Sequence, residues 1–201
     1  VDQVDRALED YKSVIHYDAN HARCHFRLGQ LAYVDQRYGD AVKSFDKVIE
    51  HSPSDWQSVF NRGQCHKFLG NWTEAREDFE KTIAMKSSFY QAHVELARLL
   101  QRESNGDGGG ASSAASPEKL IQLYDQGIKY ALGGEHGKPS AQALFAMYFE
   151  RSILLADVDA ERAVQDLDRC IALDSSNVDA HCNRGLIQYQ KLRNYKEAIV
   201  S

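Results

Sequence analysis

The chain has 201 residues, of which 43% are hydrophobic and 26% charged, and this composition excludes the highly charged, apolar-poor class of disordered proteins. Its net charge of -5 arises from 24 basic and 29 acidic residues without a basic run, which argues against nucleic-acid binding through a cationic surface. No apolar run in the sequence approaches the roughly 18 residues that a membrane-spanning helix needs.

The first elements along the chain are predicted to be helices. Residues 1–17 place apolar side chains at spacings of three and four, which is typical of an amphipathic helix. Further helices are expected at 22–35 and 38–51, and another helix pair is expected in 56–89. Pro53 ends the helix before it, because proline lacks an amide donor and clashes with the preceding turn.

A 34-residue interval relates these helices to one another. Gly29 recurs as Gly63, Ala41 as Ala75, Phe45 as Phe79 and Ile49 as Ile83, each 34 residues later. The same step backwards from the second helix reaches Ala7, Tyr11, Val14 and Ile15. A fixed period of this length is typical of stacked repeat arrays.

This pattern resembles the tetratricopeptide repeat, a helix-turn-helix unit of about 34 residues. The resemblance implies an all-α solenoid of antiparallel helix pairs in a right-handed superhelix. We expect one array over residues 1–201, made of a partial unit 1–21, units 22–55 and 56–89, an interrupted unit 90–132, a linker 133–139, a unit 140–177 and a partial unit 178–201. Because units are incomplete at both ends, we interpret the sequence as part of a longer protein.

The interrupted unit carries a Gly- and Ser-rich insertion at 103–115. We expect the insertion to be flexible, because this composition buries too little surface to offset the entropy of ordering. Ser116 and Pro117 then form a typical helix start. Two capping boxes are also expected, namely Ser54 with Gln57 and Ser88 with Gln91.

Signals for catalysis or metal binding are weak. His21, Cys24 and His25 could share one helical face and hold a metal, but no fourth ligand is evident. The segment 133–140 superficially resembles a phosphate loop, but its lysine precedes proline and no strand comes before it. No catalytic triad or carboxylate pair stands out. We therefore expect a non-enzymatic protein with no cofactor and no metal.

The cysteines favour a reducing compartment. Cys24, Cys65, Cys170 and Cys182 form no CxxC pair and are widely spaced, which argues against a disulfide framework. Cys170 falls where the repeat requires a small buried residue, a position that suits a free thiol. We expect a cytoplasmic, intracellular location, although targeting signals could lie outside this sequence.

The resemblance also implies where a partner binds. In tetratricopeptide arrays the first helix of each unit lines a concave groove, where aromatic, amide and arginine side chains can anchor a peptide. The expected peptide-binding residues are Arg23, Phe26, Arg27, Gln30, Phe60, Asn61, Gln64, Lys67, Arg98 and Asn183. We therefore expect a scaffold that binds a peptide or helix of a partner protein within a larger protein or assembly. No nucleic-acid partner and no membrane span are expected.

Two alternatives remain open. The array could serve mainly for self-association or for docking within its own protein. It could also be a co-chaperone, because chaperone-binding members of the family clamp a C-terminal carboxylate with Lys and Asn, then Asn, then Lys and Arg from three units. Asn61 matches the middle element of that clamp. The flanking positions hold Phe26, Gln30, Gln91 and Glu95, so the cationic elements are absent.

Overall fold

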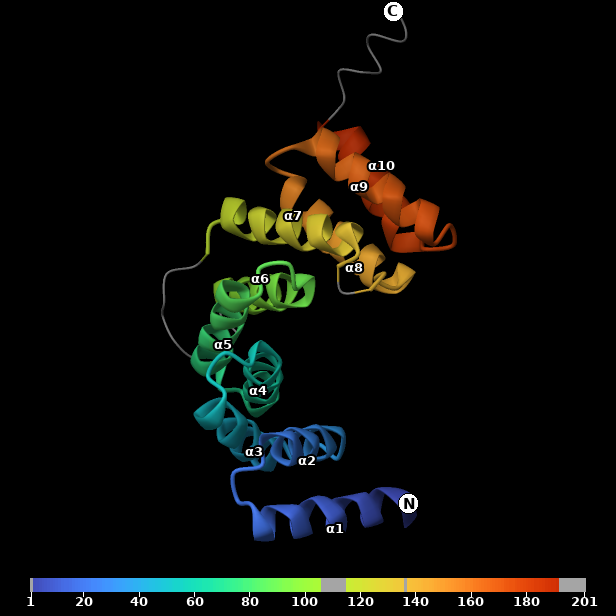
Figure 1. Ribbon diagram of the computed structural model, residues 1–201. Coiled ribbons are helices and arrows are strands. Elements are labelled where there is room, and N and C mark those ends of the chain that lie inside the picture. Colours follow the sequence, from blue (N-terminus) through green and yellow to red (C-terminus); the bar gives the residue numbers. More distant parts are fainter. Residues whose placement is uncertain (1, 106–114, 136, 192–201) are drawn as a thin grey trace, which may run out of the picture. The chain divides into compact units, whose positions relative to one another are not determined.

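The computed structural model describes residues 2–105, 115–135 and 137–191, which form ten α-helices and no strand (Figure 1). The all-α prediction is confirmed. The helices are α1 (Asp2–Tyr17), α2 (Ala22–Val34), α3 (Tyr38–His51), α4 (Trp56–Leu69), α5 (Trp72–Met85), α6 (Tyr90–Ser104), α7 (Pro117–Gly133), α8 (Ala141–Leu155), α9 (Ala160–Leu173) and α10 (Val178–Lys191).

The chain divides into two compact parts, residues 1–87 and 88–201, here named the N-terminal module (α1–α5) and the C-terminal module (α6–α10). Three predicted features lie partly outside the described residues. Residues 106–114 of the predicted insertion 103–115 are not described, and neither is residue 136 of the predicted linker. The last predicted partial unit is described only as far as residue 191.

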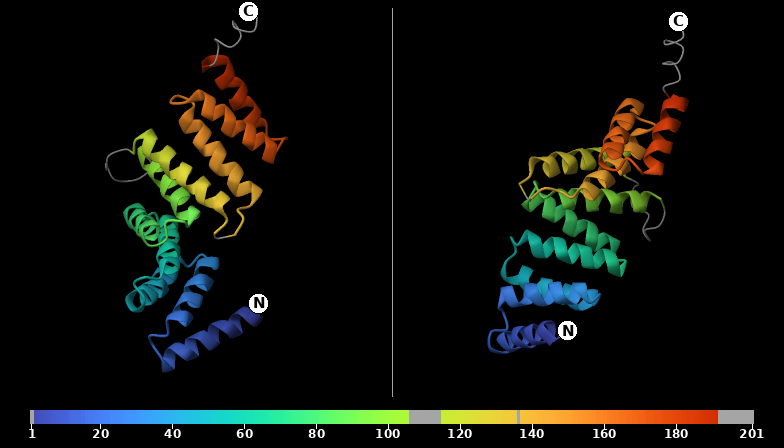
Figure 2. Two further views of the ribbon diagram at one scale, coloured as in Figure 1. Left: turned by 45° about the horizontal axis from the view of Figure 1, so that its top comes forward. Right: turned by 90° about the vertical axis from the view of Figure 1, so that its right-hand side faces the viewer.

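Consecutive helices pack against one another within each module (Figure 2). In the N-terminal module, α2 and α3 meet where Gly29 faces the fully buried ring of Phe45. A Cβ atom added to Gly29 would lie 2.7 Å from Cε1 of Phe45, so any larger residue would force the helices apart. Ala41 is also fully buried in this cluster, which explains the small residues of the repeat.

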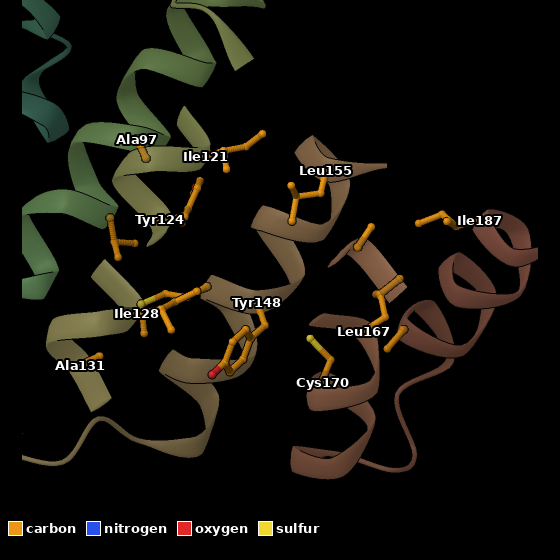
Figure 3. Close-up of a cluster of buried hydrophobic side chains, with 14 residues drawn as sticks. Ala97, Ile121, Tyr124, Ile128, Ala131, Tyr148, Leu155, Leu167, Cys170 and Ile187 are labelled. Carbon is orange, nitrogen blue, oxygen red and sulfur yellow. The ribbon is translucent and has the colours of Figure 1, made fainter. Parts of the chain in front are cut away.

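The C-terminal module has a core of the same kind (Figure 3). Tyr124 of α7 and Leu167 of α9 are fully buried, and Tyr148 of α8 lies between their helices with 6% of its surface exposed. Cys170 takes part in this core, and its thiol donates to the carbonyl oxygen of Phe145 at 3.6 Å. The apolar residues that recur at helical spacing in α6–α10 therefore form one continuous core.

The helix starts differ in part from expectation. Ser116 caps α7 by accepting a hydrogen bond from the backbone N–H of Lys119 at 3.3 Å, which confirms that prediction. The two capping boxes are wrong. Asp55 and Phe89 are the N-cap residues of α4 and α6, and neither makes a side-chain cap hydrogen bond. Because both helices begin one residue later than expected, the serines lie before the N-cap positions.

Arginines that are partly or fully buried join the helices in a pattern that the sequence analysis did not predict. Arg62 of α4 donates to both carboxylate oxygens of Asp78 on α5, at 2.8 and 2.6 Å, and to Asp46 on α3 at 2.7 Å. The hydrogen bond to Asp78 raises the pKa of Arg62 above its usual range. Each first helix that carries such an arginine is therefore tied to the helices before and after it.

The C-terminal module repeats this arrangement. Arg151 of α8 donates to both oxygens of Asp166 on α9, each at 2.7 Å, and to Asp125 on α7 at 2.6 Å. Arg184 of α10 donates to Asp168 on α9 at 2.7 Å. The carboxylate of Asp166 is almost completely buried, at 1% exposure, whereas that of Asp168 is 53% exposed.

We expect Asp166→Ala to lower the free energy of unfolding by about 3–5 kcal/mol, because it leaves the buried guanidinium of Arg151 without its main partner. Asp168→Ala is the matched control on the same helix, and it should cost less than about 1 kcal/mol because its ion pair is exposed. Urea denaturation followed by circular dichroism measures both values. Equal losses for the two variants would contradict the structural importance of the buried pair.

Candidate peptide-binding face

The first helices α2 and α4 contact each other in the N-terminal module and border two open hollows. The first hollow, of about 560 Å³, lies between α1 and α2 and is lined by Ala7, Tyr11, Arg23, Cys24, Arg27, Gln30, Leu31 and Val34. The second, of about 490 Å³, lies where α2 and α4 begin and α3 ends, and is lined by Ala22, Arg23, Phe26, Val48, Ser52, Ser54, Asp55, Trp56 and Gln57.

Four of the predicted binding residues lie on α2 around these hollows. Arg23 is exposed and lines both of them. Phe26 lines the second hollow and places its ring edge-on to Phe45, with 5.9 Å between centroids. Arg27 and Gln30 line the first hollow, where Nη1 of Arg27 donates to Oε1 of Gln30 at 2.9 Å. The structure therefore brings these four side chains together on one helix.

A row of amide side chains follows α4. Gln57, Asn61 and Gln64 are spaced by four and three residues, which places them on one side of the helix. Among the described residues, none forms a hydrogen bond with these three side-chain amides. We name Gln57, Asn61 and Gln64 the amide row. Each amide can both donate and accept a hydrogen bond.

The other predicted residues of α4 contact aromatic rings. Phe60 lies against Phe79, with 5.7 Å between ring centroids. The ammonium of Lys67 lies 5.3 Å from the centroid of Phe68, a distance at which cation and ring attract. Phe60 thus serves largely to pack α4 on α5, while Lys67 borders an aromatic surface.

That surface is an aromatic cluster formed by Tyr33, Tyr38 and Phe68. The rings of Tyr38 and Phe68 are stacked, with 4.7 Å between centroids and 8° between planes. Tyr33 meets both rings edge-on, at 5.6 and 5.8 Å. Phe68 nevertheless remains 52% exposed. The sequence analysis missed Tyr38, because it begins a second helix and lies outside the register of groove positions.

The two predicted residues of the C-terminal module have different surroundings. Arg98 of α6 forms ion pairs with Glu150 of α8 at 3.0 Å and with Glu95 at 3.4 Å. The hydroxyl of Tyr124 also donates to Glu150, at 2.9 Å, and burial raises the pKa of Tyr124 above its usual range. Arg98 therefore already has two carboxylate partners. Asn183 lies partly buried on α10.

Beside Arg98 lies a smaller hollow of about 160 Å³, lined by Tyr90, Gln91, Val94, Glu95, Arg98, Ala143 and Met147. The side-chain oxygen Oε1 of Gln91 is buried without a hydrogen-bond partner among the described residues. This hollow offers one arginine that is already neutralised and a carboxylate beside it. It is therefore a poorer site for an acidic ligand than the face of α2.

The histidines near the start of α2 bind the backbone. Nδ1 of His21 accepts a hydrogen bond from the N–H of Cys24 at 3.3 Å and caps the helix. Nε2 of His25 lies 2.8 Å from the carbonyl oxygen of Ala19. Within residues 2–105, 115–135 and 137–191, no group of three or more His, Cys, Asp or Glu side chains could hold a metal ion.

No helix in the described parts of the chain is long and apolar enough to cross a membrane.

Comparison with known proteins agrees with this architecture. Residues 2–55 match the family described as tetratricopeptide repeat. The structure resembles that of YrrB, described as a TPR protein with an unusual peptide-binding site, with a TM-score of 0.69 at 15% identity over 94% of this chain and 85% of that one. The chain carries a tetratricopeptide repeat match in residues 2–55 and has the all-α fold of that family. Its fold also resembles that of MamA, with a TM-score of 0.65 at 16% identity over 84% of this chain and 86% of that one.

This chain matches parts of two curated relatives. It is 33% identical over 91 residues to the tetratricopeptide repeat and J domain-containing co-chaperone DNJ1 of Fusarium oxysporum f. sp. lycopersici, covering 43% of this chain and 18% of that protein. It is 24% identical over 132 residues to the Hsp70-Hsp90 organizing protein of Triticum aestivum, covering 65% of this chain and 20% of that protein. The chain thus spans about a fifth of the length of either relative.

Thiol chemistry provides a test of the repeat packing. Burial raises the pKa of Cys65 and of Cys170 to about 12, from an ordinary value of 9.0, whereas Cys182 is exposed. We expect iodoacetamide near neutral pH to modify Cys182 while Cys65 and Cys170 stay unmodified, because only a thiolate reacts. Mass spectrometry of tryptic peptides measures the modification at each cysteine.

The same pKa values predict how the free energy of unfolding depends on pH. The folded-state pKa of both buried thiols lies above the unfolded one, so their contribution to stability is complete below about pH 9 and declines as the pH rises toward about 12.

The control for the iodoacetamide experiment is the unfolded chain, because denaturant should make all four cysteines reactive. Modification of Cys170 as fast as that of Cys182 in the folded protein would contradict the packing of α9.

Proposed function

We propose that the N-terminal module is a non-enzymatic protein-interaction module that binds an extended segment of a partner protein along α2 and α4. The observation that carries this proposal is the amide row of α4, whose three amides have no hydrogen-bond partner among the described residues. Unpartnered amides beside hollows and aromatic rings can bond the main chain of a bound peptide.

The same observation favours an extended ligand over a helical one. The main-chain groups of a helix are bonded within the helix, except at its ends. An extended chain instead presents free N–H and C=O groups along its length. Asn61 and Gln64 lie one turn apart at mid-helix, so both can bond successive groups of such a chain.

The chaperone-related relatives suggest one class of partner. A similar structure with a TM-score of 0.54 at 19% identity, covering 66% of this chain and 96% of that one, is named as the complex of the TPR2B domain of yeast Sti1 with an Hsp70 peptide. This chain shares Asn61 with the family's carboxylate clamp but holds Phe26 and Gln30 at the preceding clamp positions. We therefore propose a peptide-binding scaffold without assigning it a chaperone tail.

The free thiols support the proposed cytoplasmic location. Cys24, Cys65 and Cys170 are buried and unpaired by disulfides, and Cys182 is an exposed free cysteine. Exposed free thiols persist in reducing compartments and are oxidised or paired outside them. We propose that the protein acts inside the cell as one part of a larger assembly.

The test of this function uses a phage-displayed library of random twelve-residue peptides as the probe. Peptides selected on the wild-type chain should bind Asn61→Ala/Gln64→Ala about ten-fold more weakly, because each lost hydrogen bond contributes about 0.5–1.5 kcal/mol. Fluorescence anisotropy with the selected peptides measures the dissociation constants.

The matched control is Gln122→Ala/Gln126→Ala, which removes two exposed amides from α7. This control should bind the selected peptides as the wild type does, and circular dichroism should show both double variants folded. The proposal fails if no peptide is enriched, or if the enriched peptides bind the Asn61→Ala/Gln64→Ala variant with wild-type affinity.

A further inference from the structure

Arg23 of α2 differs from Arg37, which precedes α3, and from Arg62 of α4. Arg37 pairs with Asp35 and Asp40, and Arg62 pairs with Asp46 and Asp78. Arg23 is exposed and has no ion pair or hydrogen bond with any described residue. The guanidinium of Arg27 donates to an amide oxygen rather than to a carboxylate.

An arginine with free donors at the edge of two hollows is suited to a carboxylate ligand. The carboxylate that lines the second hollow, Asp55, accepts a hydrogen bond from the hydroxyl of Ser58. Arg98 of the C-terminal module, by contrast, is paired with Glu95 and Glu150. Arg23, which lines both hollows, is therefore suited to attract an acidic side chain.

The aromatic cluster lies toward the other end of the same face. Phe68 is 52% exposed, and the neighbouring Val34 and Leu69 are 75% and 44% exposed. Such an apolar surface, built from a rigid ring stack, is suited to hold one bulky side chain of a ligand. The stacking of Tyr38 on Phe68 keeps that surface in place without a ligand.

The geometry fixes the order of the two anchors. Arg23 and Gln57 line the second hollow together, while Tyr33 and Phe68 are in ring contact. Therefore α2 and α4 run in the same direction, and the remaining members of the amide row, Asn61 and Gln64, lie between the anchors. Arg23 and Tyr33 are ten residues apart, which is about 15 Å along a helix. An extended peptide covers that distance in about four to five residues.

Resting on the proposed function, we infer that the bound segment carries an acidic side chain for Arg23 and a bulky aromatic or aliphatic side chain for the aromatic cluster, about four to five residues apart. The amide row bonds the main chain between them. The ligand is thus an acidic, extended peptide with one apolar anchor, recognised through internal side chains.

The probes are fluorescein-labelled peptides of Gly and Ser that contain one Glu and one Phe, separated by one to eight positions in both orders. Affinity for the full chain, measured by anisotropy, should be highest when the two residues are four to five positions apart. Arg23→Glu should weaken the best peptide at least ten-fold, and it should strengthen binding of the matching peptide with Lys in place of Glu. Phe68→Ser should weaken every peptide that contains Phe.

Lys43→Glu is the control for charge, because it changes the net charge by the same amount on an exposed position of α3. It should leave the affinity within two-fold of the wild-type value. The inference is overturned if affinity does not depend on the spacing, if Lys43→Glu weakens binding as much as Arg23→Glu, or if no peptide binds.

The outcomes separate the two proposals. If Asn61→Ala/Gln64→Ala weakens the library-selected peptides while Arg23→Glu and Phe68→Ser do not, the proposed function stands and the anchor assignment falls. If none of these variants changes the affinity of any selected peptide, both proposals fall. If all three weaken binding and the Lys peptide gains affinity for Arg23→Glu, both are supported.

Discussion

The close approach of each first helix to its second helix determines the rest of this structure. A Cβ atom added to Gly29 would lie 2.7 Å from the ring of Phe45, and one added to Gly63 would lie 3.0 Å from the ring of Phe79. The glycine side of α2 and of α4 therefore packs within the repeat. Arg23 on α2 borders the open hollows, and the amide row on α4 has no hydrogen-bond partner among the described residues. The proposed ligand contacts and the packing contacts thus lie on different sides of the same helices.

Arg62, which is partly buried, and Arg151, which is buried, add rigidity to this packing. Arg62 and Arg151 each hold a bidentate carboxylate on the following helix and a second carboxylate on the preceding one. The position of Arg62 is taken by Leu28 one period earlier and by Leu96 one period later. An ion pair at this depth contributes little net stability over apolar packing, but it disfavours other helix arrangements, because a misplaced arginine would lack its partners.

The sequence was sufficient to predict the helix pairs, because the 34-residue period places Gly29, Ala41 and Phe45 in contact whatever lies around them. It also placed Arg23, Phe26, Arg27 and Gln30 around the hollows of α2. It could not predict that Arg98 is neutralised by Glu150, 52 residues away, because that partner lies beyond the insertion and on another repeat. The prediction of two capping boxes was wrong because the 34-residue period does not determine a helix start to within one residue.

Arg23 and Arg98 differ in the carboxylates that surround them. Both arginines occupy first helices, on the side that the repeat register assigns to ligands. Arg23 keeps its donors free, whereas Arg98 has given them to Glu95 and Glu150. One carboxylate on a neighbouring helix therefore decides whether an arginine of a first helix keeps its donors free. Glu150 also accepts a hydrogen bond from the hydroxyl of the buried Tyr124, so its loss would disturb the core as well as release Arg98.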